Sequence, residues 1–161
     1  MVRRPEEILC QLLKDRGIDS AEDISEFLSD KPRKTYDPFL LLNMEAGVDL
    51  LLSEINKGTK ICIYGDYDVD GVTSVSILYM YLASIGADVG YYIPSRLGEG
   101  YGMSNDSLCK LHSEGCSMII TVDTGITAAD EVEYAKSLGI DTVVTDHHEC
   151  RAEIPHACAV I

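Results

Sequence analysis

From residue 60 onward, short apolar runs alternate with longer segments in which apolar residues recur at helical spacing. The runs lie at 60–64, 88–93, 117–122 and 140–145, and the helical segments between them lie at 71–85, 104–113 and 127–138. This order predicts strands that alternate with helices. Because such an alternation is typical of parallel sheets, we predict an α/β fold with an open, mainly parallel, Rossmann-like sheet and helices on both faces.

Three further helices are predicted before this pattern begins. Two of them are short, at 5–16 and 20–28, and Asp19 or Ser20 can cap the second. The third lies at 44–56 and has leucines along one side. A helical segment is therefore expected to precede the sheet.

The polar stretch between the second and third helices suggests a division of the chain. We expect an N-terminal helical appendage at 1–43 and the main domain at 44–161. The apolar run at 157–161 resembles the start of a fifth strand, so we expect the main domain to be truncated at its C-terminal end. The alternative is a short terminal edge strand.

The composition excludes several classes of protein. With 46% hydrophobic residues, the chain is too apolar to be disordered, and it contains no run of ~18 apolar residues that could span a membrane. It has 13 basic and 27 acidic residues, and a net charge of −14 argues against gripping nucleic acid by bulk charge alone. No secretory signal is seen and the six cysteines form no CxxC pair, so we expect a cytoplasmic protein with free thiols.

Polar residues follow each predicted strand. Asp66, Asp68 and Asp70 follow the first strand, Arg96 the second, Asp123 the third, and Asp146, His147 and His148 the fourth. In an open parallel sheet, ligands bind beyond the carboxyl ends of the strands. These aspartates, histidines and the arginine should therefore meet in one crevice.

Carboxylates gathered so closely need a counter-charge. Two unit charges ~4 Å apart repel by about 4 kcal/mol at an effective dielectric near 20. Divalent cations held by aspartate oxygens and histidine nitrogens would relieve this repulsion. Because the set contains no cysteine, it favours Mn²⁺ or Mg²⁺ over Zn²⁺ or Co²⁺, and we predict two divalent metal ions.

Simpler interpretations explain less. The segment from Asp66 begins like a calcium-binding loop, but its twelfth position is Ile77 and a strand precedes it. Aspartates also form turns and helix caps, which would account for only one or two of them. Cys150, His156 and Cys158 follow no standard zinc spacing.

Three ordered motifs resemble those of the DHH phosphoesterase superfamily. They are Tyr64-Gly65-Asp66-Tyr67-Asp68-Val69-Asp70-Gly71-Val72-Thr73-Ser74, then Val122-Asp123-Thr124-Gly125, then Asp146-His147-His148. The segment Ile93-Pro94-Ser95-Arg96, followed by Glu99-Gly100-Tyr101-Gly102, is similar to the RecJ branch of single-strand-specific exonucleases. The resemblance extends from about residue 16 to the end, so the main domain resembles a DHH catalytic domain.

The resemblance implies a role for each matching residue. Asp68 and Asp70 would each ligate one of two metals, and Asp123 would bridge both. His147 would be a further metal ligand, with Asp66 and Asp146 at or beside the metals. His148 would contact the phosphate or help the leaving group, and Arg96 would hold a substrate phosphate. Asp123 and His148 are thus the expected catalytic residues.

The resemblance also implies a function. RecJ-like enzymes hydrolyse single-stranded DNA from the 5′ end in DNA repair and recombination. The expected partners are therefore single-stranded DNA and other repair proteins, with no membrane. The family's fourth motif, with another metal-binding aspartate, would lie beyond Ile161, as would the second domain that closes the groove. Some relatives have a histidine where Tyr64 stands, so one metal would lack a nitrogen ligand.

Two alternatives remain open. Another DHH phosphoesterase would act on short oligoribonucleotides, cyclic dinucleotides or pyrophosphate. A receiver-like α/β module would use an acidic pocket for signalling without catalysis, but it would have no need for the His147–His148 pair.

Overall fold

The computed structural model of the chain describes residues 4–31, 35–98, 100–150 and 153–161. The chain divides into two compact units, Met1–Asp37 and Pro38–Ile161. This division falls a few residues before the boundary expected between 43 and 44, and the assignment of these units as domains stays a prediction.

The first unit contains helices α1 (Pro5–Lys14) and α2 (Ala21–Phe27). Ser20 is the N-cap of α2, and its hydroxyl accepts a hydrogen bond from the Asp23 backbone N–H at 3.0 Å. Leu13 is the one buried hydrophobic residue that α1 contributes. Both helices lie within the ranges predicted from the sequence.

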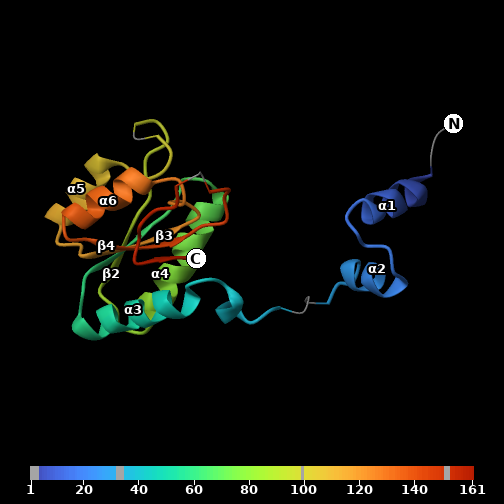
Figure 1. Cartoon of the computed structure of the whole chain (residues 1–161), viewed down its shortest axis with the longest axis horizontal. Coiled ribbons are helices and arrows are strands. Elements are labelled where there is room, and N and C mark those ends of the chain that lie inside the picture. The colour runs from blue at the N-terminus through green and yellow to red at the C-terminus, as the bar shows by residue number, and fades with distance from the viewer. Residues whose placement is uncertain (1–3, 32–34, 99, 151–152) are drawn as a thin grey trace. The chain divides into compact units, whose positions relative to one another are not determined.

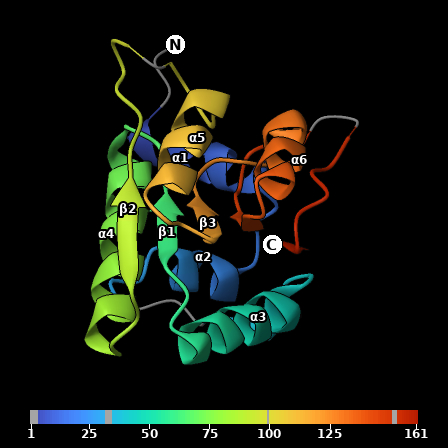
Figure 2. The same cartoon turned by 90° about the vertical axis from the view of Figure 1, so that its left-hand side faces the viewer.

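The second unit contains a five-stranded sheet with all neighbours parallel, in the order β2-β1-β3-β4-β5. Figure 1 shows β2, β3 and β4 with α5 and α6 on one side and α3 on the other. The strands are β1 (Ile61–Tyr64), β2 (Val89–Tyr92), β3 (Met118–Val122), β4 (Asp141–Thr145) and β5 (Ala159–Val160). The helices are η1 (Pro38–Leu40), α3 (Met44–Lys57), α4 (Val69–Ser84), α5 (Asn105–Ser113) and α6 (Ala129–Ser137). Figure 2 shows β2 beside β1, pointing the same way. The predicted α/β fold is therefore confirmed.

Alternate residues of each strand enter two separate cores, one on each face of the sheet. Cys62, Ile119 and Val144 pack with buried side chains of α5 and α6. Ile63 and Ile120 pack with buried side chains of α4 and partly buried leucines of α3. Because successive strand residues point to opposite faces, near-continuous apolar strands supply both cores.

Helix α4 begins at Val69, two residues before the predicted start at 71. The reason is its cap: the Asp68 side chain accepts a hydrogen bond from the Gly71 backbone N–H at 3.0 Å. The outer side of α4 leaves Ile77 and Met80 about two-thirds exposed. Within the described residues, every helix falls short of the length and apolar character that crossing a bilayer requires.

Candidate metal centre

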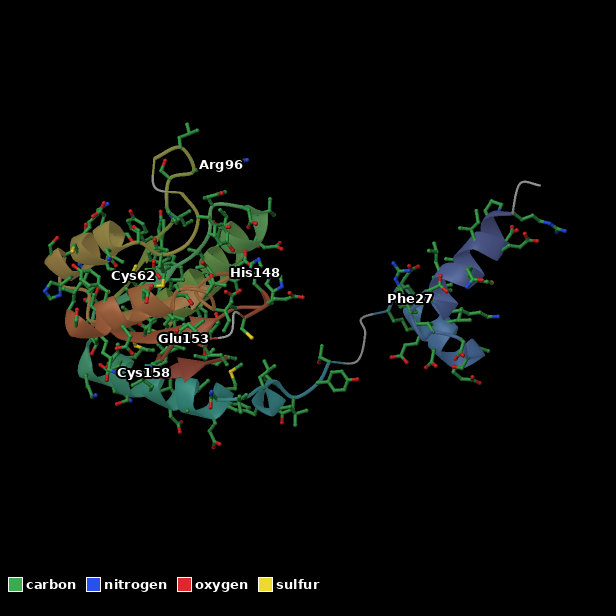
Figure 3. The ribbon with its side chains drawn as sticks, turned by 45° about the horizontal axis from the view of Figure 1, so that its top comes forward. Phe27, Cys62, Arg96, His148, Glu153 and Cys158 are labelled. Atoms are coloured by element: carbon green, nitrogen blue, oxygen red, sulfur yellow. The ribbon has the colours of Figure 1, made fainter. Side chains whose placement is uncertain are left out.

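The loops that follow the first four strands leave the sheet at one edge, because all the strands are parallel. Figure 3 labels Arg96 on the loop after β2 and His148 beside the N-terminal end of α4. We call residues 65–71 the β1 turn and residues 146–150 the β4 turn. These two turns and Asp123, the residue after β3, supply the expected metal-binding side chains.

In the β1 turn, backbone packing positions the three aspartates. Asp66 is 2% exposed, and a Cβ placed on Gly71 would lie 2.7 Å from the Asp66 backbone nitrogen. Because glycine has no Cβ, the backbone of Gly71 in the first turn of α4 can pack against the backbone of Asp66. Asp68 and Asp70 are exposed, the first as the N-cap and the second in the first turn of α4.

Asp123 has a left-handed backbone, with φ of 59°. Aspartate tolerates this conformation better than most residues, and left-handed residues often occur at functional sites. One carboxylate oxygen, Oδ1, lies 3.0 Å from His147 Nε2. Burial, followed by the nearby Asp68 charge, raises the pKa of Asp123 above its ordinary value.

In the β4 turn, one carboxylate organises the backbone and both histidines. Asp146 Oδ1 accepts hydrogen bonds from the backbone N–H groups of His147 and His148, at 2.8 and 3.1 Å, and lies 2.8 Å from His148 Nδ1. Its Oδ2 accepts a bond from the Ile126 N–H at 3.0 Å. Burial opposes ionisation of Asp146, but these hydrogen bonds outweigh it and lower the pKa. The bond to Asp146 in turn raises the pKa of His148.

The structure brings most of the predicted residues together. Ligand atoms of Asp123, His147 and His148 all lie within 4.8 Å of one another. Asp70 and Asp146 join Asp123 and His147 in lining a cavity of about 550 Å³. Among the described residues, the cysteines and histidine at 150, 156 and 158 form no comparable cluster.

Arg96 lies apart from the cluster, and Asp66 and Asp68 belong neither to the cluster nor to the cavity lining. The Arg96 guanidinium carbon lies 5.6 Å from the centre of the Tyr67 ring, on an exposed loop. Within the part of the chain that the structure describes, no ion pair joins Arg96 to the carboxylates, and two aromatic rings connect it to the cluster instead. Tyr67 contacts Tyr101 with ring centres 6.3 Å apart, and Tyr101 contacts His148 at 6.4 Å.

Sequence reasoning did not assign roles to the tyrosines around the centre. Tyr101 lies between two glycines, which indicates a loop that exposes the tyrosine side chain. This pattern alone predicts no catalytic or binding role for Tyr101. Tyr64 is fully buried. Its hydroxyl lies 3.0 Å from the Gly102 carbonyl oxygen and 3.0 Å from Ser107 Oγ, so here it fixes the loop that carries Tyr101.

The donor atoms fit divalent metal ions. Asp66 Oδ1 and Asp123 Oδ2 are buried carboxylate oxygens for which the described part of the chain provides no hydrogen-bond partner. A buried oxygen of this kind is costly unless a cation or proton satisfies it. Aspartate oxygens with imidazole nitrogens suit Mn²⁺, and the carboxylates alone suit Mg²⁺.

Comparisons with known proteins agree with this geometry. Residues 60–161 match the family model described as DHH family, N-terminal domain. The chain is 44% identical to the single-stranded-DNA-specific exonuclease RecJ of Bacillus subtilis over 154 residues, which cover 96% of this chain and 20% of that protein. The chain therefore spans about a fifth of the length of this relative.

Solved structures give the same result. A crystal structure of exonuclease RecJ bound to manganese matches 78% of this chain and 32% of its own, with a TM-score of 0.69 and 37% identity. RecJ from Thermus thermophilus in complex with Mn²⁺ matches 91% of this chain and 20% of its own, with a TM-score of 0.66 and 29% identity. The same Thermus protein has also been solved in complex with Mg²⁺.

Proposed function

The chain belongs to the DHH family, and from that premise we propose that it carries the metal centre of an exonuclease that hydrolyses single-stranded DNA. The cluster of Asp123, His147 and His148 at the carboxyl edge of the sheet is the observation that carries the proposal. RecJ, the relative described above, is named for this activity. We further propose digestion from the 5′ end, a role in repair and recombination with other repair proteins as partners, and a cytoplasmic location.

Asp68, Asp70, Asp123 and His147 are the residues that would hold two divalent ions, Mn²⁺ or Mg²⁺, with Asp66 directly beneath. When bound, such ions polarise the phosphoryl oxygens and lower the pKa of a coordinated water. The protein supplies the fixed positions of these ligands. Asp123 is central because it contacts His147 through one oxygen and leaves the other buried and available.

Asp146 was expected at or beside the metals, and its hydrogen bonds support a further role in positioning His148. Because His148 Nδ1 lies 2.8 Å from Asp146 Oδ1, Nδ1 carries the proton and Nε2 is directed away from that carboxylate. The raised pKa of His148 increases the fraction with a proton on Nε2 near neutral pH. His148 can then donate to a phosphate oxygen or to the leaving oxygen, as a general acid does.

Arg96 would hold a substrate phosphate farther from the centre. Its guanidinium carbon lies 5.6 Å from the centre of the Tyr67 ring. This contact uses the face of the guanidinium, so its N–H donors remain available for a phosphate of the DNA. The chain's net charge of −14 makes such a local cation important for binding DNA.

The variant Asp123→Asn in the intact protein tests the proposal. Asparagine accepts the left-handed backbone, so the fold should persist while metal-dependent degradation of single-stranded DNA falls at least a hundredfold. Asp88→Asn, an exposed aspartate at the opposite edge of the sheet, is the matched control and should leave the rate unchanged. Full activity of Asp123→Asn on single strands would contradict the proposal.

The choice of substrate separates the proposal from the alternatives. The wild-type protein should degrade long single strands faster than dinucleotides, cyclic dinucleotides or pyrophosphate. A preference for the short substrates would indicate another DHH phosphoesterase. Titration with Mn²⁺ should show two bound ions, whereas a receiver-like module would take up one.

A further inference from the structure

A second cavity, of about 330 Å³, adjoins the metal centre and is used by none of the proposed chemistry. Its polar lining consists of Tyr101, two threonines and three acidic residues: Thr124, Thr127, Asp130, Glu131 and Glu153. Thr124, which lines the cavity, is the next residue in the chain after Asp123 of the metal cluster. Its volume lies at the lower end of the ~300–1,000 Å³ typical of small-molecule sites.

The lining indicates the chemistry of the occupant. Carboxylates of Asp130 and Glu131 repel a phosphate, but they accept hydrogen bonds from amino groups. The threonine hydroxyls can both donate and accept. The cavity therefore suits a neutral group that has ring nitrogens, amino groups and an aromatic face.

Tyr101 lies between this cavity and the metal centre. Its side chain is 54% exposed, and it contacts the His148 ring at 6.4 Å and the Tyr67 ring at 6.3 Å, both nearly perpendicular. The ring is neutral at physiological pH, as a tyrosine ordinarily is. An exposed neutral aromatic ring beside a phosphate-cleaving centre is suited to stack on a base.

The loop holds this ring in a defined place. Gly100 and Gly102, which flank Tyr101, both have φ of 81°. The Tyr64 hydroxyl lies 3.0 Å from the Gly102 carbonyl oxygen and anchors the loop to the buried end of β1. A ring that is already fixed loses little conformational freedom when a base stacks on it.

We propose that this cavity binds the nucleobase of the strand-end nucleotide, with Tyr101 stacked on the base while the adjoining phosphodiester lies at the metal cluster. The inference rests on the proposed nuclease function and adds a base site to it. A terminal base that is paired in a duplex must first be unpaired and unstacked from its neighbour to enter such a site, so the cavity favours unpaired ends.

The test compares a 5′-phosphorylated single strand with the same strand whose first nucleotide is abasic. For the wild-type protein, removing the base should lower kcat/KM about tenfold, within the range of ~5- to 150-fold that corresponds to stacking of one base. Tyr101→Leu should show the same loss on the normal strand and no further loss on the abasic strand. Tyr101→Phe keeps the ring and should retain most of the wild-type preference.

Two outcomes would overturn the base site: equal rates for both strands with the wild-type protein, or equal loss on both strands with Tyr101→Leu. The second would indicate a structural role for Tyr101. Binding of a strand with terminal 2-aminopurine gives a readout that needs no cleavage. The wild-type protein should quench its fluorescence, and Tyr101→Leu should not. If the wild-type protein quenches the fluorescence but does not degrade single strands, the nuclease proposal is wrong and the base site remains.

Discussion

The β1 turn and the β4 turn both deliver side chains to the metal centre, but different interactions hold them in place. The β1 turn is fixed by its backbone: Gly71 lies against Asp66, and Asp68 caps α4. The β4 turn is fixed by the Asp146 carboxylate, which accepts hydrogen bonds from three backbone N–H groups and lies 2.8 Å from a ring nitrogen of His148.

The positions of the side chains are therefore controlled by steric contacts in the β1 turn and by electrostatic interactions in the β4 turn. In the β1 turn, the positions of the carboxylates depend on the absence of a Cβ atom, so charge can be changed without moving the chain. In the β4 turn, the position of His148 depends on a charge, so removing that charge changes both geometry and protonation. Four tests distinguish these two kinds of control, and they follow in order of decreasing expected effect.

Gly71→Ala should be the most disruptive change. The new Cβ would meet the Asp66 backbone at 2.7 Å or closer, and relief requires the start of α4 to move. We expect the free energy of unfolding to fall by about 3 kcal/mol, measured by chemical denaturation. Gly90→Ala, where no atom lies within 4 Å, is the control and should change stability by less than about 1 kcal/mol. Equal effects of both substitutions would contradict steric control of the β1 turn.

Asp146→Asn should weaken the β4 turn. Hydrogen bonds to a charged group contribute about 1.5–3 kcal/mol each, but asparagine keeps an acceptor oxygen, so we expect a total loss of about 2 kcal/mol. The same variant should return the pKa of His148 toward 6.5, measured by NMR titration of the metal-free protein. An unchanged His148 titration would show that Asp146 does not position this residue.

Two substitutions at Asp68 separate its cap from its charge. Asp68→Ala removes the acceptor for the Gly71 N–H and should cost about 1 kcal/mol of stability. Asp68→Asn keeps the cap and should leave stability nearly unchanged, and removal of the charge should lower the pKa of Asp123. Both variants should lose nuclease activity. If Asn destabilises as much as Ala, the charge and not the cap holds the β1 turn.

The pH dependence of the β4 turn should be the smallest effect, because the His148 side chain is 46% exposed and solvent screens its charge. Its pKa is raised in the folded state, so the His148–Asp146 pair stabilises the fold fully below 6.5, its unfolded value, and this contribution is lost as the pH rises through the folded pKa. The difference in the free energy of unfolding between the metal-free wild-type protein and Asp146→Asn should therefore narrow as the pH rises through this range, down to the part that the backbone hydrogen bonds of Asp146 contribute. A constant difference would contradict the linkage.

Hydrophobic periodicity predicted the sheet well because its strands are apolar on both faces and its helices end at glycines such as Gly86 and Gly139. It placed the start of α4 two residues late, because the cap depends on the Asp68 side chain reaching Gly71. No periodicity marks the single turn η1, and none was predicted.

The site was predictable to the level of strand order. Residues that follow parallel strands must share an edge, so Asp123 and His147 could be expected together. The direction in which each of these side chains points could not be predicted from the sequence. Tertiary hydrogen bonds direct Asp146 toward the histidine backbone, and ring stacking directs Arg96 over Tyr67. The cavity beside Tyr101 depends on residues from three loops and the first turn of α6, which no local pattern relates.

The left-handed backbone of Asp123 also limits which amino acids this position can accept. A library randomised here and selected only for folding should return Gly, Asn and Asp, because β-branched residues are strongly disfavoured at this φ. A library selected for DNA degradation should return Asp alone. The backbone therefore excludes most substitutions before the chemistry is tested, and the two selections together would measure how much of the constraint each one imposes.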